Sequence, residues 1–103
     1  MSGALDGRTA VVTGASSGIG LAVTQRLIGD GARVFASARS PADLDAVRAG
    51  AAITGGFVGE LHVSGVADDL TAAAVAELGH IDILVNNAGG GVILPTLAHT
   101  EET

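Results

Sequence analysis

The sequence lacks cysteine, tryptophan and tyrosine, and all five of its basic residues are arginines. The absence of cysteine excludes disulfides, thiolate chemistry and cysteine-based zinc sites. His62, His80 and His99 lie too far apart to form a helical pair of metal ligands, so the sequence predicts no metal site. The net charge of −6 argues against a nucleic-acid partner, because nucleic acid binds to basic surfaces. Any anionic ligand must therefore be held by a few local groups.

Long apolar runs are absent as well. None approaches the length that spans a bilayer, and the first residues lack the basic and apolar regions of a signal peptide. We therefore expect no membrane partner and a cytoplasmic location. With 103 residues, 48% of them hydrophobic, the chain is suited to one small domain with a core.

Glycine is abundant, and its most informative cluster lies in residues 13–20. This segment joins a short apolar strand, expected over residues 9–13, to an amphipathic helix expected over residues 19–29. A strand that turns directly into a helix presents the free N–H groups of the first helical turn to an anion. Gly14, Gly18 and Gly20 can supply an unusual φ, an open approach for the ligand and close packing of helix on strand. The pattern predicts a site for the phosphates of a dinucleotide.

Short apolar runs alternate with helical stretches along the rest of the chain. This alternation predicts an α/β fold with parallel strands joined by right-handed crossovers. Further strands are expected over residues 33–38, 57–63 and 81–85, and further helices over residues 41–48 and 66–78. The side chains of the first helix that its periodicity places on one apolar face are Ile19, Ala22, Val23 and Leu27.

The spacing Thr-Gly-x-x-x-Gly-x-Gly in residues 13–20 resembles the glycine loop of the short-chain dehydrogenases/reductases. The run Asn86-Asn87-Ala88-Gly89, which follows the apolar residues 81–85, resembles the second signature of that family. The resemblance covers nearly the whole chain. It implies a partial Rossmann (doubly wound) parallel sheet, with about four strands in the order 3-2-1-4 and three helices. It also implies an oxidoreductase that transfers hydride between NADP(H) and a carbonyl or alcohol.

The family typically uses a Tyr-x-x-x-Lys pair, in which tyrosine is the general acid/base and lysine lowers its pKa. This sequence has neither residue type, so it offers no catalytic residue. Residues 1–103 are interpreted as an NAD(P)-binding domain that ends before the catalytic half. The alternatives are a non-catalytic dinucleotide-binding module or partner subunit, and a non-functional truncated product.

By the resemblance, the pyrophosphate lies on the backbone N–H groups of Ser16, Ser17 and Ile19, with both serine hydroxyls as further donors. Arg39 follows the second expected strand, where an NAD-selective site carries an acidic residue. Because Ala38 precedes it, no carboxylate there repels a phosphate, and the guanidinium can pair with a 2′-phosphate. NADP is therefore favoured over NAD. The alternative is that Arg39 is a solvated surface side chain.

His62-Val63 stands where the family usually has Asp-Val beside the adenine, so the usual carboxylate contact to the adenine amino group is lost. The alternative is a strand-end histidine without a ligand role. By the same resemblance the inner edge of the cofactor meets Asn86, Ala88 and Gly89, and the asparagine side chains also tie neighbouring backbone segments together. A structural role of these residues is favoured at least as much as direct contact, and the two roles are compatible. The predicted cofactor-binding residues are Gly14, Ser16, Ser17, Gly18, Ile19, Gly20, Arg39, His62, Val63, Asn86, Ala88 and Gly89.

Residues 81–85, as the last strand of such a sheet, would form an open apolar edge. Exposed edges of this kind pair with other chains. The sequence therefore predicts self-association, or a partner chain, at this edge.

Overall fold

The computed structural model describes residues 3–87 and 94–97. Their sheet has five strands in the order β3-β2-β1-β4-β5. Four of them are mutually parallel: β1 (Thr9–Thr13), β2 (Arg33–Ala38), β3 (Gly55–Val58) and β4 (Ile83–Asn86). The doubly wound α/β architecture and the predicted order of the first four strands are confirmed.

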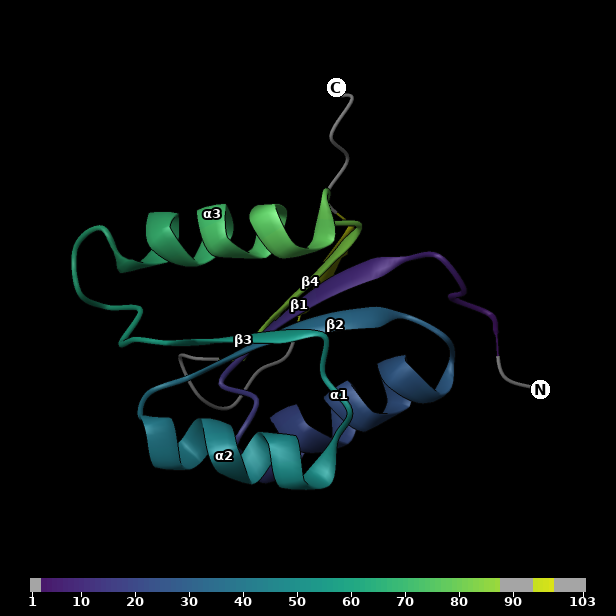
Figure 1. Ribbon diagram of the computed structural model, residues 1–103, viewed down its shortest axis with the longest axis horizontal. Coiled ribbons are helices and arrows are strands. Elements are labelled where there is room, and N and C mark those ends of the chain that lie inside the picture. Colours follow the sequence, from purple (N-terminus) through teal and green to yellow (C-terminus); the bar gives the residue numbers. More distant parts are fainter. Residues whose placement is uncertain (1–2, 88–93, 98–103) are drawn as a thin grey trace.

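Helices cover both faces of the sheet, so the molecule has three layers (Figure 1). The helices are α1 (Gly18–Gly29), α2 (Pro41–Gly50) and α3 (Val66–Leu78). α1 and α2 lie on one face of the sheet, and α3 lies on the other. Each of them connects two parallel strands, which is the arrangement that alternating strand and helix patterns favour.

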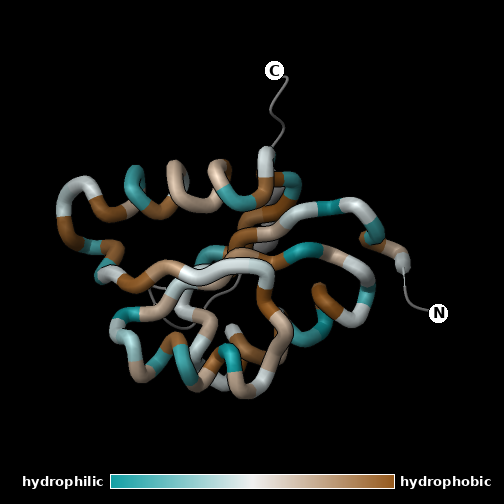
Figure 2. Tube along the Cα trace, in the orientation of Figure 1, coloured by the Kyte–Doolittle hydropathy of each residue, from teal (hydrophilic) through white to brown (hydrophobic). Residues whose placement is uncertain are grey.

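The core consists of two apolar clusters, one on each face of the sheet. Val12 and Val34 pack toward α1 and α2 together with Val47 of α2. Val11 and Phe35, their neighbours along the strands, point to the opposite face and pack with α3. This follows from the two-residue period of a strand. Figure 2 shows the resulting hydrophobic segments in the sheet, between the two helical layers.

The predicted bounds of β1, β2 and α3 are confirmed, whereas two strands differ. β3 begins at Gly55 and ends at Val58, where it pairs with Ala38 at the end of β2. The expected strand over residues 57–63 is therefore placed too late, because the length and register of β2 determine where β3 ends. β4 begins at Ile83, since Asp82 before it is engaged through its side chain with Thr9.

The buried face of α1 agrees with the prediction only in part, because Val23 and Leu27 pack against the apolar cluster of this face and Ile19 and Ala22 do not. Ile19 is 54% exposed and Ala22 is exposed, whereas Gly20 and Thr24 are buried. Gly20 lies close against the backbone of the preceding turn. This contact sets the rotation of α1 about its axis, so that Gly20 and Thr24, which are four residues apart on one side of the helix, face the sheet. The Thr24 hydroxyl is satisfied by donating to the Gly20 carbonyl oxygen at 2.8 Å.

β4 is not an open edge, contrary to the prediction. β5 (Leu94–Leu97) pairs with it in the antiparallel sense, from Ile83 opposite Leu97 to Asn86 opposite Leu94. The N–H and C=O groups along β4 thus have backbone partners, which removes the basis for association through this strand. Pro95 lies in β5, at the edge of the described sheet, where a strand tolerates a missing N–H.

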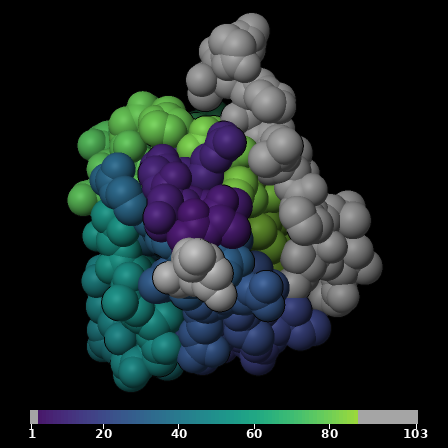
Figure 3. Space-filling model, turned by 90° about the vertical axis from the view of Figure 1, so that its right-hand side faces the viewer, coloured from purple at the N-terminus to yellow at the C-terminus, as the bar shows by residue number. Residues whose placement is uncertain are grey.

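The N-terminal segment lies on the surface at the end of the sheet where β1 begins, with α3 above it and the opposite helical layer below (Figure 3). Its backbone is fixed at two points. The Leu5 N–H donates to the Asp30 carbonyl at 2.7 Å, and the Arg33 N–H donates to the Arg8 carbonyl at 3.0 Å. None of the helices in the described part of the chain is both long and apolar enough to cross a membrane.

Candidate functional site

A groove of about 930 Å³ lies at the carboxyl ends of the parallel strands. It is lined by Gly14 after β1, by Ser37, Ala38 and Arg39 at the end of β2, and by Asn86 and Asn87 at the end of β4. In the sheet, β1 has β2 as its neighbour on one side and β4 on the other. The groove therefore lies at the point where the order of the strands reverses direction. Open α/β sheets bind their ligands at this position.

The turn from β1 into α1 gives each of its three glycines a separate task. Gly14 has a φ of +62°, which favours glycine. A Cβ on Gly20 would collide with the Gly14 carbonyl oxygen, so only glycine lets α1 approach the turn this closely. A Cβ on Gly18 would meet no atom within 4 Å, which leaves the helix end open to a ligand. The roles of Gly14 and Gly20 are those that the sequence predicts, and the role of Gly18 in the approach of a ligand stays a prediction.

Three backbone N–H groups at this turn are free to donate to an anion. Gly18 and Ile19 occupy the first two positions of α1, where no intrahelical acceptor exists. The Ser16 N–H forms no hydrogen bond within the described part of the chain. Since all three lie at the positive end of α1, the turn has the donors that an anionic group requires.

Ser17 caps α1 and is less available than predicted. Its hydroxyl donates to the Gly14 carbonyl at 3.1 Å and accepts from the Gly20 N–H at 3.0 Å. Its own N–H donates to the same carbonyl at 3.3 Å. The expectation that this hydroxyl is a free donor is therefore wrong, because the capping of the helix takes it. Gly18 supplies a free N–H in place of Ser17.

Asn87 is a site residue that the sequence reasoning left out. Its side chain is buried and donates to the Ser17 hydroxyl at 2.7 Å and to the Gly14 carbonyl at 3.3 Å. The Asn87 N–H donates to the Thr13 hydroxyl at 2.9 Å. The neighbouring Asn86, which the sequence selects, is exposed at the end of β4. Both asparagines belong to the Asn86-Asn87-Ala88-Gly89 run. The sequence therefore could not indicate which of the two side chains points toward the glycine turn.

Arg39 lies on the groove wall directly after β2, as predicted. Its side chain is exposed and forms no ion pair or hydrogen bond with any described residue. Ser40 follows as the N-cap of α2 and accepts from the Asp43 N–H at 3.1 Å, so the backbone next to Arg39 is fixed. Among the described residues that line the groove, Arg39 is the only one with a permanent positive charge.

The segment after β3 forms another part of the groove wall. His62 lines the groove, whereas Val63 is 50% exposed and is not among the lining residues. Ala88 and Gly89 lie outside the described residues. Lining residues that are absent from the predicted cofactor-binding set are Ser37, Ala38, Asp43, Gly59, Glu60, Leu61, Ala67 and Asn87.

The comparisons with known proteins identify the family. A family profile described as short chain dehydrogenase matches residues 8–103. The chain belongs to the short-chain dehydrogenase family. It is 42% identical over 104 aligned residues to 2,3-dihydroxy-2,3-dihydro-p-cumate dehydrogenase of Pseudomonas putida, an alignment that covers 96% of this chain and 40% of that protein.

Solved structures of similar proteins share the fold of this chain. The citronellol catabolism dehydrogenase of Pseudomonas aeruginosa superposes with a TM-score of 0.72 at 31% identity, covering 84% of this chain and 38% of that chain. Actinorhodin polyketide ketoreductase, solved as the F189W variant with NADPH, gives a TM-score of 0.67 at 36% identity, covering 78% and 32% respectively. The chain spans about 40% of the length of the curated relatives that it matches.

The groove fits the nicotinamide dinucleotide that short-chain dehydrogenases bind. Of the three free N–H groups, that of Ser16 belongs to the groove lining, whereas Gly18 and Ile19 follow the lining residue Ser17 and are not among the lining residues themselves. Together these donors suit a pyrophosphate, and the space above Gly18 is open. No three His, Asp or Glu side chains gather into a metal-binding group within the described residues.

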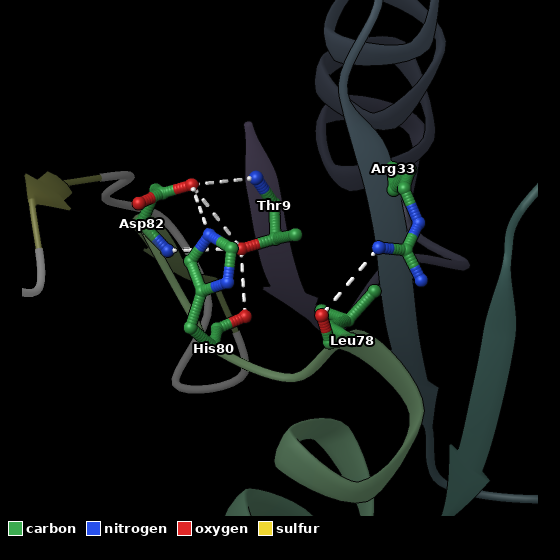
Figure 4. Close-up of polar contacts among 5 residues, drawn as sticks. All are labelled: Thr9, Arg33, Leu78, His80 and Asp82. Carbon is green, nitrogen blue, oxygen red and sulfur yellow. Dashed lines mark hydrogen bonds and ion pairs between the residues drawn. The ribbon is translucent and has the colours of Figure 1, made fainter. Parts of the chain in front are cut away.

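A second polar cluster lies at the start of β1, at the end of the sheet opposite to the groove (Figure 4). Asp82 accepts from the Thr9 N–H at 2.9 Å and lies 3.0 Å from His80 Nε2. The Thr9 hydroxyl donates to the His80 carbonyl at 2.7 Å. Burial raises the pKa of Asp82, but the Thr9 N–H, the His80 charge and the side-chain hydrogen bonds outweigh it and lower the pKa below its ordinary value of 3.8.

Arg33 belongs to the same end of the sheet. Its guanidinium donates to the carbonyl oxygens of Leu78 at 3.4 Å and Glu77 at 3.2 Å, at the carboxyl end of α3. A cation at this end of a helix satisfies free carbonyls and complements the helix dipole. The contacts of Thr9, Asp82 and Arg33 thus fix α3 and β4 against β1 and β2, and we assign them a structural role.

Proposed function

We propose that this chain binds NADP(H) in the groove, as the cofactor-binding portion of an oxidoreductase that transfers hydride between NADP(H) and a carbonyl or alcohol. The observation that carries the proposal is the position of Arg39 on the same groove wall as the glycine turn. Arg39 supplies a permanent positive charge, and the glycine turn supplies free backbone N–H donors at the N-terminus of α1. Together they suit a ligand with a pyrophosphate and a further phosphate.

The preference for NADP over NAD rests on the end of β2. The residue at this point is Ala38, which lines the groove and has no carboxylate to offer to the 2′-hydroxyl of an NAD ribose. The unpaired guanidinium of Arg39 is able to form a bidentate pair with a 2′-phosphate. This supports binding of NADP, because no charged group in the described part of the chain already neutralises Arg39.

The remaining proposed contacts follow the path of the cofactor through the groove. The pyrophosphate is held by the N–H groups of Ser16, Gly18 and Ile19. Ser17 and Gly20 act through the geometry of the turn, and Asn86 borders the groove at β4. For Ala88 and Gly89, contact with the cofactor stays a prediction from the sequence.

When bound, the nicotinamide supplies the hydride chemistry. The residues of this chain contribute binding and orientation, because the sequence has no tyrosine or lysine for proton transfer.

Calorimetric titration with NADP and NAD tests the proposal. We expect wild-type protein to bind NADP more tightly, and Arg39→Ala to lose about ten- to hundredfold in NADP affinity with little change for NAD. Ala38→Asp should move the preference toward NAD by repelling the 2′-phosphate. Arg8→Ala is the matched control, because Arg8 is exposed and precedes β1, at the opposite end from the groove. Equal losses for both cofactors in Arg39→Ala would overturn the NADP assignment.

A further inference from the structure

The Ser37 hydroxyl is an exception among the buried polar side chains of this chain. Ser37 is 2% exposed, and its hydroxyl forms no hydrogen bond with any residue in the described ranges 3–87 and 94–97. The other buried polar side chains in these ranges all have hydrogen-bond partners, and they are Thr9, Thr13, Thr24 and Asn87. A buried hydroxyl without a partner costs free energy, because it has lost its hydrogen bonds to water. An unsatisfied group of this kind requires an explanation.

The backbone holds Ser37 firmly in the middle of the sheet. Its carbonyl accepts from the Ala15 N–H at 3.0 Å, and on the other side of β2 it pairs with Phe57 of β3. Its side chain lies on the same face of the sheet as that of Phe35, two residues earlier, which packs toward α3. Ser37 also lines the groove. A rigid strand therefore presents the hydroxyl at a place that a ligand in the groove reaches.

The side of the sheet on which Ser37 lies indicates which part of a dinucleotide meets its hydroxyl. The glycine turn leads into α1, on the opposite face of the sheet from α3 (Figure 1). On the α3 side, the groove is bordered by the segment after β3 and by Ala67 in the first turn of α3. Ser37 shares this side and lies two residues before Arg39, the proposed partner of the 2′-phosphate. The nucleoside that carries this phosphate therefore extends to Ser37, whereas the pyrophosphate stays at the glycine turn.

We propose that the Ser37 hydroxyl binds the adenine nucleoside of the dinucleotide and stays without a partner until that ligand is present, an inference that rests on the proposed binding of NADP. A hydroxyl both donates and accepts, so it matches the ring nitrogens and the amino group of the base. The ligand-free protein bears the cost of the buried unpaired group, and the bound ligand removes it. Ser37 is thus a binding residue that lowers the stability of the ligand-free fold, a compromise that is common at functional sites.

Ser37→Ala separates binding from stability, because it removes the hydroxyl with little change in volume. In the ligand-free protein, we expect the midpoint of thermal unfolding to rise by about 4–8 °C, since an unsatisfied buried group is gone. Calorimetric titration should show an NADP affinity lower by about three- to tenfold, which is the worth of one hydrogen bond. NAD and the half-ligand adenosine 2′,5′-bisphosphate should lose affinity by the same factor, because both contain the adenine nucleoside.

Thr9→Val is the matched control, because it removes a buried hydroxyl that has a partner. The Thr9 hydroxyl donates to the His80 carbonyl at 2.7 Å, at the end of the sheet opposite to the groove (Figure 4). This variant should unfold at a lower temperature than wild-type protein and retain its NADP affinity. The two substitutions are therefore expected to change stability in opposite directions.

Three results would overturn the inference and leave the proposed function standing. A lower unfolding midpoint for Ser37→Ala would show that the hydroxyl has a partner within the folded protein. An unchanged affinity for all three ligands would show that it does not bind them. A loss for NADP and NAD without one for adenosine 2′,5′-bisphosphate would move the contact to the nicotinamide half. Binding of none of the ligands by wild-type protein would instead overturn the proposed function and this inference with it.

Discussion

The Asn87 side chain donates to the Ser17 hydroxyl at 2.7 Å and so joins the end of β4 to the turn that begins α1. Ser17 is also the N-cap of α1, and Asn87 reaches the Gly14 carbonyl in the same turn. One buried amide therefore determines how the glycine turn lies against β4. The shape of the proposed cofactor site depends on this contact, although neither polar group is expected to touch the reacting atoms.

We expect Asn87→Ala to lower the free energy of unfolding by about 1–3 kcal/mol, because it removes the two hydrogen bonds that this buried amide donates to the glycine turn. Urea denaturation measures the change. The matched control is Asn86→Ala, at an exposed position whose Oδ1 accepts from the Thr13 hydroxyl at 3.1 Å. Its loss should be smaller, since Thr13 retains the Val85 carbonyl as an acceptor. Equal losses in the two variants would contradict the role assigned to Asn87.

The two glycines that flank Ile19 should respond differently to alanine. Gly20→Ala places a Cβ against the Gly14 carbonyl, which belongs to the backbone and cannot turn aside. We expect a loss of about 1–3 kcal/mol in unfolding free energy. Gly18→Ala meets open space and should leave stability nearly unchanged while it weakens NADP binding. Thermal unfolding and calorimetric titration separate the two effects, and a destabilised Gly18→Ala with unaltered NADP affinity would refute this distinction.

The Asp82 cluster predicts an acid-sensitive contribution to stability. The folded-state pKa of Asp82 is lowered from 3.8, so its contribution is complete at pH values well above 3.8 and is lost as pH falls through the lowered pKa. Asp82→Asn should therefore reduce stability at neutral pH and flatten its decrease between about pH 5 and about pH 2. Unfolding free energies measured across that range check the effect. Parallel pH profiles for Asp82→Asn and wild-type protein would speak against the role assigned to the Asp82 carboxylate.

Pure protein of this sequence should not reduce ketones or aldehydes with NADPH. General acid/base catalysis contributes roughly 10²–10⁴ in rate, and the sequence has neither tyrosine nor lysine to provide it. The absorbance of NADPH, followed over a panel of carbonyl compounds, measures turnover. A short-chain dehydrogenase of known activity, assayed beside it, is the positive control. Sustained NADPH oxidation that depends on the carbonyl compound would show that other groups replace the missing pair.

The sequence by itself determined the features that depend on neighbouring residues. The apolar runs of β1 and β2 and the period of α3 appear with the predicted bounds, and Ser40 caps α2 ahead of Pro41 as its residue type favours. The roles of Gly14 and Gly20 also followed from spacing, because backbone conformation and the lack of a Cβ are local properties. The strand order came from the family resemblance and could not be derived from the runs alone.

Tertiary structure decided which way side chains point and which segments meet. The burial of Gly20 rotates α1 so that Ile19 is exposed, and Asn87 rather than Asn86 turns inward to Ser17. The antiparallel pairing of β5 with β4, and the approach of Glu60 to the groove, join segments that no local pattern relates. These outcomes depend on packing and hydrogen bonding between residues distant in the chain, where a rotation of one residue exchanges a buried side chain for an exposed one.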